Sequence, residues 1–225
     1  MKVTYDFEFD DGTTLGYEVD LDRRPVDAAK LDNEAEQWVR LEHCQCSNCP
    51  LKNSGTKYCP AAFDIQKVVE DFKTQPAFQK VKVNVKTPER SYSKRASLEE
   101  GLRSLMGLIM ASSHCPILSE LKPMAKHHMP FATNDEFILR SVSMYLLQQY
   151  FEFRAQTNPD WELKGLVERN KRLQLVNQAL WQRIHDVCKG DSNLKALLSF
   201  FSMSSSVSFS LETQLQKLKT SLSRQ

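Results

Sequence analysis

Residues 1–21 alternate between apolar and polar side chains, which is the period of a β-strand with one buried face. Two apolar runs share this period, first Val3, Tyr5, Phe7 and Phe9, then Leu15, Tyr17, Val19 and Leu21. Asp11 and Gly12 lie between the runs and form a strong turn signal. The pattern therefore predicts a β-hairpin.

The following segments switch between the strand and helix periods. Trp38–Leu41 has the composition of a short third strand, and residues 60–73 carry apolar side chains at helical spacing. Residues 80–86 return to strict alternation, with valines on one side and mostly lysines on the other. Residues 90–95 are predicted to pair with them as a further strand.

From residue 97 onward the pattern is helical. Ser97–Glu100 and Thr133–Glu136 each have the sequence of a capping box, and Cys115-Pro116 is expected to open another helix. A long helix is predicted from Asn158 to Lys189. The serine-rich stretch Ser202–Ser210 is expected to loosen the chain before a last amphipathic helix.

These elements predict an α+β fold. Residues 1–96 form a β-rich half, with an antiparallel layer, one helix and a cysteine-bearing loop, and residues 97–225 form an all-α bundle. We expect one integrated unit, because a thin β layer has little core of its own. Leucines recur every seven residues on the long helix, which favours packing within the chain over a dimer seam and leaves the oligomeric state open.

Composition and charge exclude several classes of protein. The chain is 41% hydrophobic and 26% charged, as is usual for a globular protein. Residues 1–36 carry 11 acidic and 4 basic side chains, whereas the remainder carries 17 and 26, an excess too small for a dedicated DNA-binding domain. No apolar run is long enough to span a membrane, and Met1 leads directly into the first strand pattern without a signal segment. We therefore expect a cytoplasmic protein.

The cysteines carry the chemistry that the sequence suggests. Cys46 and Cys49 form a CxxC pair, and proline directly follows Cys49, Cys59 and Cys115, although the chain has only 9 prolines. Proline is favoured at the first position of a helix, so Cys59 and Cys115 are predicted at helix N-termini. There the helix dipole stabilises a thiolate, which is the form that binds metals. The sequence therefore predicts one metal site formed by Cys46, Cys49, Cys59 and Cys115.

The identity of the metal stays open. A CxxC pair with two further cysteines is a common zinc set, so zinc is preferred, and its tetrahedral geometry requires sulfurs within about 4 Å of one another. An iron–sulfur cluster uses the same thiolate ligands, with the sulfurs further apart. Without a metal, the four thiols would be buried packing residues or a redox-sensitive loop.

Three neighbouring residues are candidates for an additional ligand or for support of the metal ligands. Cys44 lacks the proline context of the other cysteines. His43 and His114 each directly precede a cysteine and could bind the metal or hydrogen-bond to its ligands.

The predicted second strand pair is basic. Its candidate nucleic-acid-binding residues are Lys80, Lys82, Lys86, Lys94 and Arg95. Such lysines more often keep a sheet edge soluble than bind nucleic acid.

Several stretches resemble a family of uncharacterised bacterial proteins. The similar stretches, within residues 38–163, include CSNCPL, YCPAA, KVKVNVKTPER, HHMPFAT and NPDWEL. The resemblance implies a bacterial origin and supports a joint role for Cys46, Cys49, Cys59 and Cys115, but it implies no activity.

The sequence favours a non-enzymatic role, because it contains no GxSxG, HExxH, Walker or GxGxxG motif. We expect a metal-stabilised protein that acts by binding another macromolecule, most simply a protein. The alternatives are an iron–sulfur protein in redox sensing or electron transfer, and a nucleic-acid-binding protein.

Overall fold

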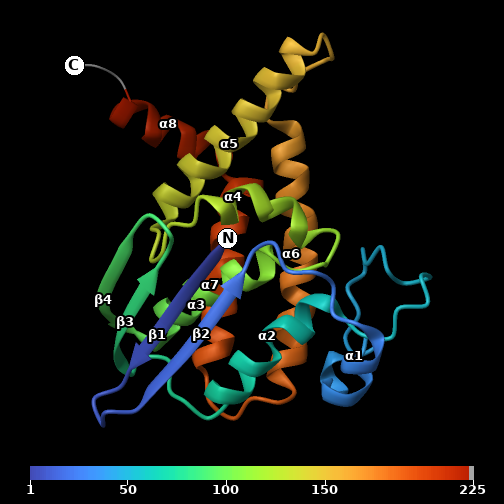
Figure 1. Ribbon diagram of the computed structural model, residues 1–225. Helices are drawn as coiled ribbons and strands as arrows, with labels where there is room; N and C mark the ends of the chain where they lie inside the picture. Colours follow the sequence, from blue (N-terminus) through green and yellow to red (C-terminus); the bar gives the residue numbers. More distant parts are fainter. Residues whose placement is uncertain (223–225) are drawn as a thin grey trace.

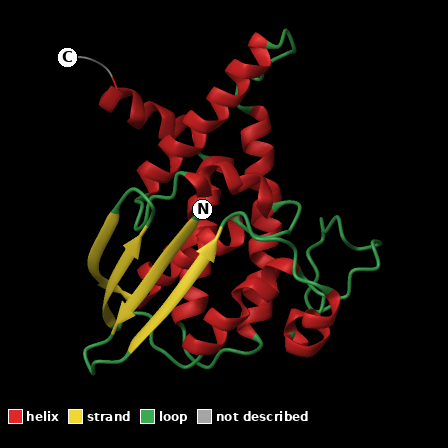
Figure 2. Ribbon diagram, viewed as in Figure 1, coloured by secondary structure: helices red, strands yellow, loops and turns green. Residues whose placement is uncertain are grey.

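A four-stranded antiparallel sheet forms one layer of the computed structural model, which describes residues 1–222 (Figure 2). The order of the strands is β2-β1-β3-β4. Their bounds are β1 Lys2–Glu8, β2 Thr14–Asp20, β3 Lys80–Lys86 and β4 Ser91–Ser97. Both predicted strand pairs are confirmed. The predicted helical half extends to residue 225, and residues 223–225 lie outside the described part of the chain.

Helices cover one face of this sheet, and the remaining helices pack behind them (Figure 1). The shorter elements are α1 Ala28–Glu34, η1 Gln37–Val39, η2 Leu118–Leu121 and α4 Lys122–Lys126. The longer helices are α2 Pro60–Phe72, α3 Leu98–Ala111, α5 Asn134–Arg154, α6 Lys164–His185, α7 Ser192–Phe209 and α8 Leu211–Leu222. The predicted α+β fold is therefore confirmed.

The alternation in the sequence decides which face of the sheet is covered. The buried side chains of β1 and β3 are Val3, Tyr5, Phe7, Val81, Val83 and Val85. Phe7 contacts Phe72 of α2, with ring centroids 5.4 Å apart. It also lies against Gly101 of α3, where any added Cβ would meet its ring at 2.7 Å. Gly101 therefore allows α3 to approach the sheet.

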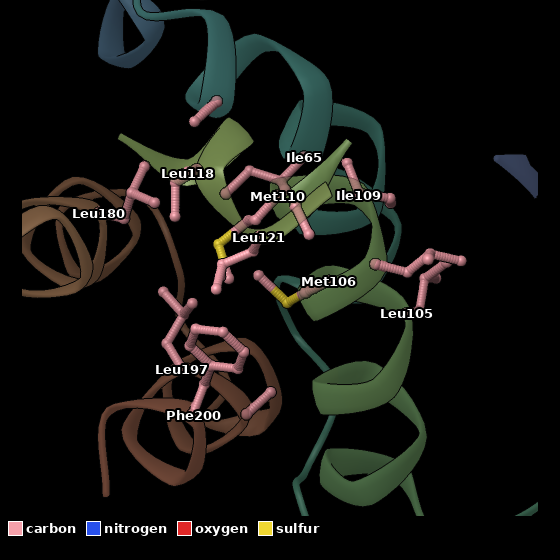
Figure 3. Packing of buried hydrophobic residues seen from close by; sticks show 14 of the residues in the cluster. Ile65, Leu105, Met106, Ile109, Met110, Leu118, Leu121, Leu180, Leu197 and Phe200 are labelled. Atoms are coloured by element: carbon pink, nitrogen blue, oxygen red, sulfur yellow. The ribbon is translucent and has the colours of Figure 1, made fainter. Parts of the chain in front are cut away.

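The core joins both halves of the chain. Figure 3 shows Ile65 of α2, Met110 of α3 and Leu118 of η2 facing Leu180 of α6 and Leu197 of α7. These residues belong to one hydrophobic cluster that also contains the buried face of the sheet. The seven-residue repeat of α6 is buried against α7 within the same chain.

The predicted strand at Trp38–Leu41 is wrong. Gln37–Val39 forms a 3-10 turn, and a single bridge joins Arg40 to Tyr58. The carbonyl oxygens of Trp38, Arg40 and Leu41 accept hydrogen bonds from the Arg183 side chain, so they are taken by a side chain rather than a neighbouring strand. The apolar residues here pack inward without forming a ladder.

The serine-rich stretch does not loosen the chain, because α7 runs through it to Phe209. Serine hydroxyls there donate to carbonyl oxygens one turn earlier, as Ser206 does to Ser202 at 3.1 Å and Ser210 to Ser206 at 3.0 Å. Ser202–Phe209 is therefore helix, contrary to the prediction, with Ser210 as its C-cap. Ser204 is fully buried, and its hydroxyl has no partner among the described groups.

Three helix starts also differ from expectation. The helix predicted from Asn158 begins at Lys164, after Leu163 adopts a left-handed φ of 61°. The segment after Cys115-Pro116 forms η2 and α4 rather than one helix. Ser97 precedes α3 as predicted but makes no side-chain cap, and Glu100 pairs with Lys94 at 2.6 Å instead. The Thr133 capping box is confirmed.

Within residues 1–222, no helix is by itself both long and apolar enough to cross a membrane. Only α7 combined with Leu211–Thr220 reaches that length and composition, across a bend of 89°.

Candidate metal centre

The four cysteines of the predicted site come from three separate segments. Cys46 and Cys49 lie on the loop between η1 and α2, the loop that extends beside α6 in Figure 1. Cys59 is the N-cap residue of α2, with Pro60 at the first helical position as predicted. Cys115 lies in the turn between α3 and η2. All four line one small cavity, so residues far apart in the sequence meet there.

The thiols of this cavity influence one another. Each of the four cysteines interacts electrostatically with the other three. Burial, and then the neighbouring thiols, raise the pKa of Cys46 to about 12. Burial raises the pKa of Cys115 to about 11, although backbone N–H groups of the following turn oppose this shift. Without a cation the thiols of Cys46 and Cys115 are therefore neutral, and a bound metal would displace their protons.

The separation of the sulfurs distinguishes two kinds of metal site. Within the described residues, no three of these four sulfurs lie within 4.8 Å of one another. Tetrahedral zinc with Zn–S bonds of about 2.3 Å would hold each pair of sulfurs about 3.8 Å apart. A cluster places several metal atoms between its ligands, so its cysteines stand further apart. The arrangement is therefore wider than a zinc tetrahedron.

Arg183 of α6 lines the same cavity and is only 1% exposed. It donates to the carbonyl oxygens of Trp38, Arg40 and Leu41 at 2.7, 2.6 and 2.9 Å. No carboxylate in the described part of the chain lies within ion-pair distance of it, and its buried Nε has no hydrogen-bond partner. Its charge lowers the pKa values of Cys46 and Cys59, opposing the effect of burial. The cavity thus contains a buried cation without an anionic partner.

Sequence reasoning missed Arg183, although a signal was present. It follows Leu180 by three residues and precedes Val187 by four, so it falls on the apolar stripe of the long helix. A charged residue on such a stripe is rarely buried unless it has a partner. The loop is held to α6 at a second point, where the Asn48 side chain donates to the carbonyl oxygen of Arg172 at 3.1 Å.

His43 and Cys44 form a separate group with Asp186. His43 Nε2 lies 2.9 Å from Asp186 Oδ2, and Cys44 Sγ lies 3.7 Å from the same oxygen. Within residues 1–222, these three side chains form a group of possible metal ligands, because their ligand atoms all lie within 4.8 Å of one another. All three are at least partly exposed, and such exposed groups are common without a metal. They lie beside the four-cysteine cavity as neighbours rather than as lining residues.

His114 also lies apart from the cavity lining. It is exposed, and burial of its ring lowers its pKa, followed by the charge of Arg23. Asp64, which forms a bidentate pair with Arg23, opposes that shift. His114 thus lies near the largely buried Arg23–Asp64 ion pair and does not line the cavity of the four cysteines.

The basic strands are exposed but interleaved with acidic side chains. Lys82 pairs with Glu8 at 2.9 Å, because β1 lies directly beside β3, and Arg95 pairs with Asp10 at 2.9 Å. Lys80 and Lys86 are exposed on the same strand. The five candidate residues therefore do not form a continuous positive stripe.

Lys94 lies on the opposite face from Lys82, because it stands in register with buried Val83. Its Nζ lies 5.7 Å from the ring centroid of Phe131 on the helical side. Neighbouring residues of a strand point to opposite faces, which separates Lys94 from Arg95.

A model of a protein family matches residues 3–223, and that family is described as a domain of unknown function, DUF6901. No curated protein and no solved structure matches the chain.

Proposed function

The chain belongs to the DUF6901 family. We propose that its cysteine cavity holds an iron–sulfur cluster for electron transfer or redox sensing, bound by Cys46, Cys49, Cys59 and Cys115. The observation that carries the proposal is the spacing of the four thiols. They surround one cavity and interact with one another, yet no three of their sulfurs, all within the described residues, lie within 4.8 Å. Four cysteines at such spacing suit a cluster better than a single ion.

The charge of the cavity supports the same assignment. Four thiolates around an iron–sulfur core leave a net negative charge, and a buried charge is costly unless it is paired. Arg183 supplies a buried positive charge at the cavity wall. Its unpartnered Nε is a donor suited to a cluster or cysteine sulfur. The guanidinium would thus offset part of the negative charge of the cluster.

The position of the site supports electron exchange with a partner protein. Cys46 and Cys49 are only partly buried, on the loop that extends from the body of the molecule (Figure 1). Cys59 and Cys115 are buried and connect the site to α2 and α3. Electrons would therefore enter and leave through the CxxC loop.

Zinc is the second candidate, and the composition of the loop favours it. Residues 43–58 contain few apolar side chains, so their order must come from ligands. A zinc ion would draw the four sulfurs inward to about 3.8 Å. The site would then be structural, and the protein would act by binding another macromolecule.

Anaerobic purification with iron, sulfide and zinc analysis tests both assignments. A cluster gives visible absorption that bleaches on reduction with dithionite, whereas zinc gives none. Cys59→Ser should remove this absorption, and Cys188→Ser should retain it, because Cys188 lies outside the cavity. Zinc without iron would replace the first proposal by the second. Protein free of both metals after anaerobic purification would overturn both.

A further inference from the structure

A second cavity lies between α3, α4, α5 and α7, away from the cysteines. Its volume is about 90 Å³. Its walls are largely apolar, and include Leu108, Leu121, Phe137, Phe200 and Met203. Figure 3 labels Leu121 of η2 and Phe200 of α7, two of these wall residues. Phe131 and Met129 also line it, and Met129 is 38% exposed, so the cavity reaches the surface.

A chain of hydrogen bonds lines one side of this cavity. The backbone N–H of Phe131 donates to Ser104 Oγ at 3.2 Å, and Ser104 Oγ lies 2.8 Å from the Tyr5 hydroxyl. The Tyr5 hydroxyl also bonds to Nε2 of His128. Tyr5 is fully buried on β1, so the sheet and the cavity share this chain.

The partners of Ser104 suggest a direction for the chain. We take the Ser104 hydroxyl to donate to Tyr5, because the other partner of Ser104 is an N–H donor. In that arrangement Tyr5 gives its own proton to Nε2 of His128. A neutral imidazole that accepts at Nε2 carries its hydrogen on Nδ1. The chain therefore ends in a donor on His128.

His128 stays neutral in this position. Burial, and then the charge of Arg140, lower its pKa to about 3. Its Nδ1–H has no acceptor among the described groups, and the ring lines the cavity. The wall thus offers one uncharged N–H donor.

Two arginines add positive charge to the same wall. Arg140 donates through Nη2 to the carbonyl oxygens of Met124 and His127 at 2.9 and 2.7 Å. Arg103 donates to Ser199 Oγ at 3.0 Å and to the carbonyl oxygen of Ala132 at 3.3 Å.

Neither guanidinium has a carboxylate within ion-pair distance in the described part of the chain. Glu136 is bonded to the backbone N–H and hydroxyl of Thr133, and its charge also acts on Arg140 without forming an ion pair. Both arginines therefore retain N–H groups for an anionic ligand.

We propose that this cavity binds a small apolar carboxylate, whose hydrocarbon part fills the apolar walls and whose carboxylate meets Arg140, Arg103 and the Nδ1–H of His128. A carboxylate only accepts hydrogen bonds, and these three side chains only donate at the positions left open. The apolar walls exclude a strongly hydrated inorganic anion as the preferred ligand. The HHMPFAT segment, His127–Thr133, supplies part of this wall and does not line the proposed iron–sulfur site.

Isothermal titration with butanoate and 1-butanol tests the proposal, since the two probes share a short chain suited to a cavity of about 90 Å³ and differ in charge. Butanoate should bind at least about tenfold more tightly than butanol, because a charge-assisted bond to arginine adds affinity. Arg140→Gln should remove this preference and leave butanol binding unchanged. The matched control is Arg154→Gln, which alters an exposed arginine of the same helix α5 and should change neither affinity.

Arg140→Lys keeps a positive charge and should retain part of the preference, which separates loss of charge from loss of fold. Circular dichroism verifies that each variant is folded. Equal binding of the two probes, no binding of butanoate at about 5 mM, or an unchanged preference in folded Arg140→Gln would overturn the proposal.

Discussion

The two cavities of this protein differ in how completely the chain satisfies its own polar groups. Around the four cysteines, the described residues leave a buried guanidinium without an anion, and burial raises the pKa values of the Cys46, Cys59 and Cys115 thiols. Around His128, a chain of hydrogen bonds provides partners for Ser104 and Tyr5. The guanidinium of the first cavity thus lacks an anionic partner within the described residues, whereas Ser104 and Tyr5 of the second have hydrogen-bond partners.

This difference predicts different responses to loss of a bound group. Removal of a metal from the cysteine site would leave four thiols facing one another beside a loop with few apolar side chains. Removal of a ligand from the His128 cavity leaves an apolar cavity with intact walls. The stability of the chain should therefore depend strongly on the first site and weakly on the occupant of the second.

The largest effect is expected from Cys49→Ser. If a metal orders this loop as proposed, loss of one ligand should lower the melting temperature by on the order of 10 °C and make residues 43–58 sensitive to protease. Differential scanning calorimetry and limited proteolysis measure both changes. Cys188→Ser is the control, since Cys188 contacts Asn193 outside the cavity. Unchanged melting and cleavage in Cys49→Ser would show that folding of the loop does not depend on a metal.

Arg183→Met should have the next largest effect. It leaves the carbonyl oxygens of Trp38, Arg40 and Leu41 without their donors, at a cost of roughly 3 kcal/mol. If Arg183 also neutralises a bound cluster, the cost should be larger in the metal-loaded protein than after chelation. Chemical denaturation of the two forms measures this coupling. Equal costs in both forms would show that Arg183 serves only the loop.

The free energy of unfolding should depend on pH through His128, which lies in the second cavity. The pKa of His128 is about 3 in the folded chain, against about 6.5 for an exposed histidine. Between these values the unfolded chain binds one more proton, so the free energy of unfolding falls as pH falls. His128→Gln should reduce this slope by up to about 1.4 kcal/mol per pH unit.

Denaturation curves of the native chain and of His128→Gln between pH 4 and pH 7 measure that difference. Parallel curves would mean that His128 is solvated or already charged in the folded chain. The hydrogen-bond chain through Tyr5 would then have a different direction.

The smallest effect on stability is expected for a substitution on the exposed strands, which serves as a reference for the substitutions in both cavities. Lys82 pairs with Glu8 in solvent, where ion pairs contribute little. Lys82→Gln should leave the melting temperature almost unchanged. Gel-shift assays at physiological salt should show no binding of the native chain to DNA or RNA. A submicromolar, salt-sensitive complex would instead make these strands a nucleic-acid surface.

Local patterns in the sequence determined much of the fold. Strict alternation in residues 1–21 and 80–86 predicted the strands, because a half-buried sheet has the same period. Helical spacing and Pro60 predicted α2 almost to the residue. The proline after Cys59 marked a helix start as predicted, whereas Cys115 lies in the turn before η2 rather than at a helix N-terminus. Backbone N–H groups of the following residues face both sulfurs. These signals act between residues close in the chain.

Local reasoning was wrong where a distant partner decided the structure. Trp38–Leu41 has strand composition, but Arg183 takes its carbonyl oxygens. Ser202–Ser210 looks too polar for a core helix, but several of its hydroxyls bond within α7. Lys94 and Arg95 are neighbours in the basic stretch, yet the register of β3 and β4 places them on opposite faces.

The sequence by itself identified the four cysteines as one group and left the metal open. Only the tertiary structure placed them around one cavity and added the buried charge of Arg183. It alone also connected Tyr5 of the first strand to His128, 123 residues later. Such contacts depend on the packing of α3 and α6 against the rest of the chain, and no short-range pattern encodes the distance between atoms that packing brings together.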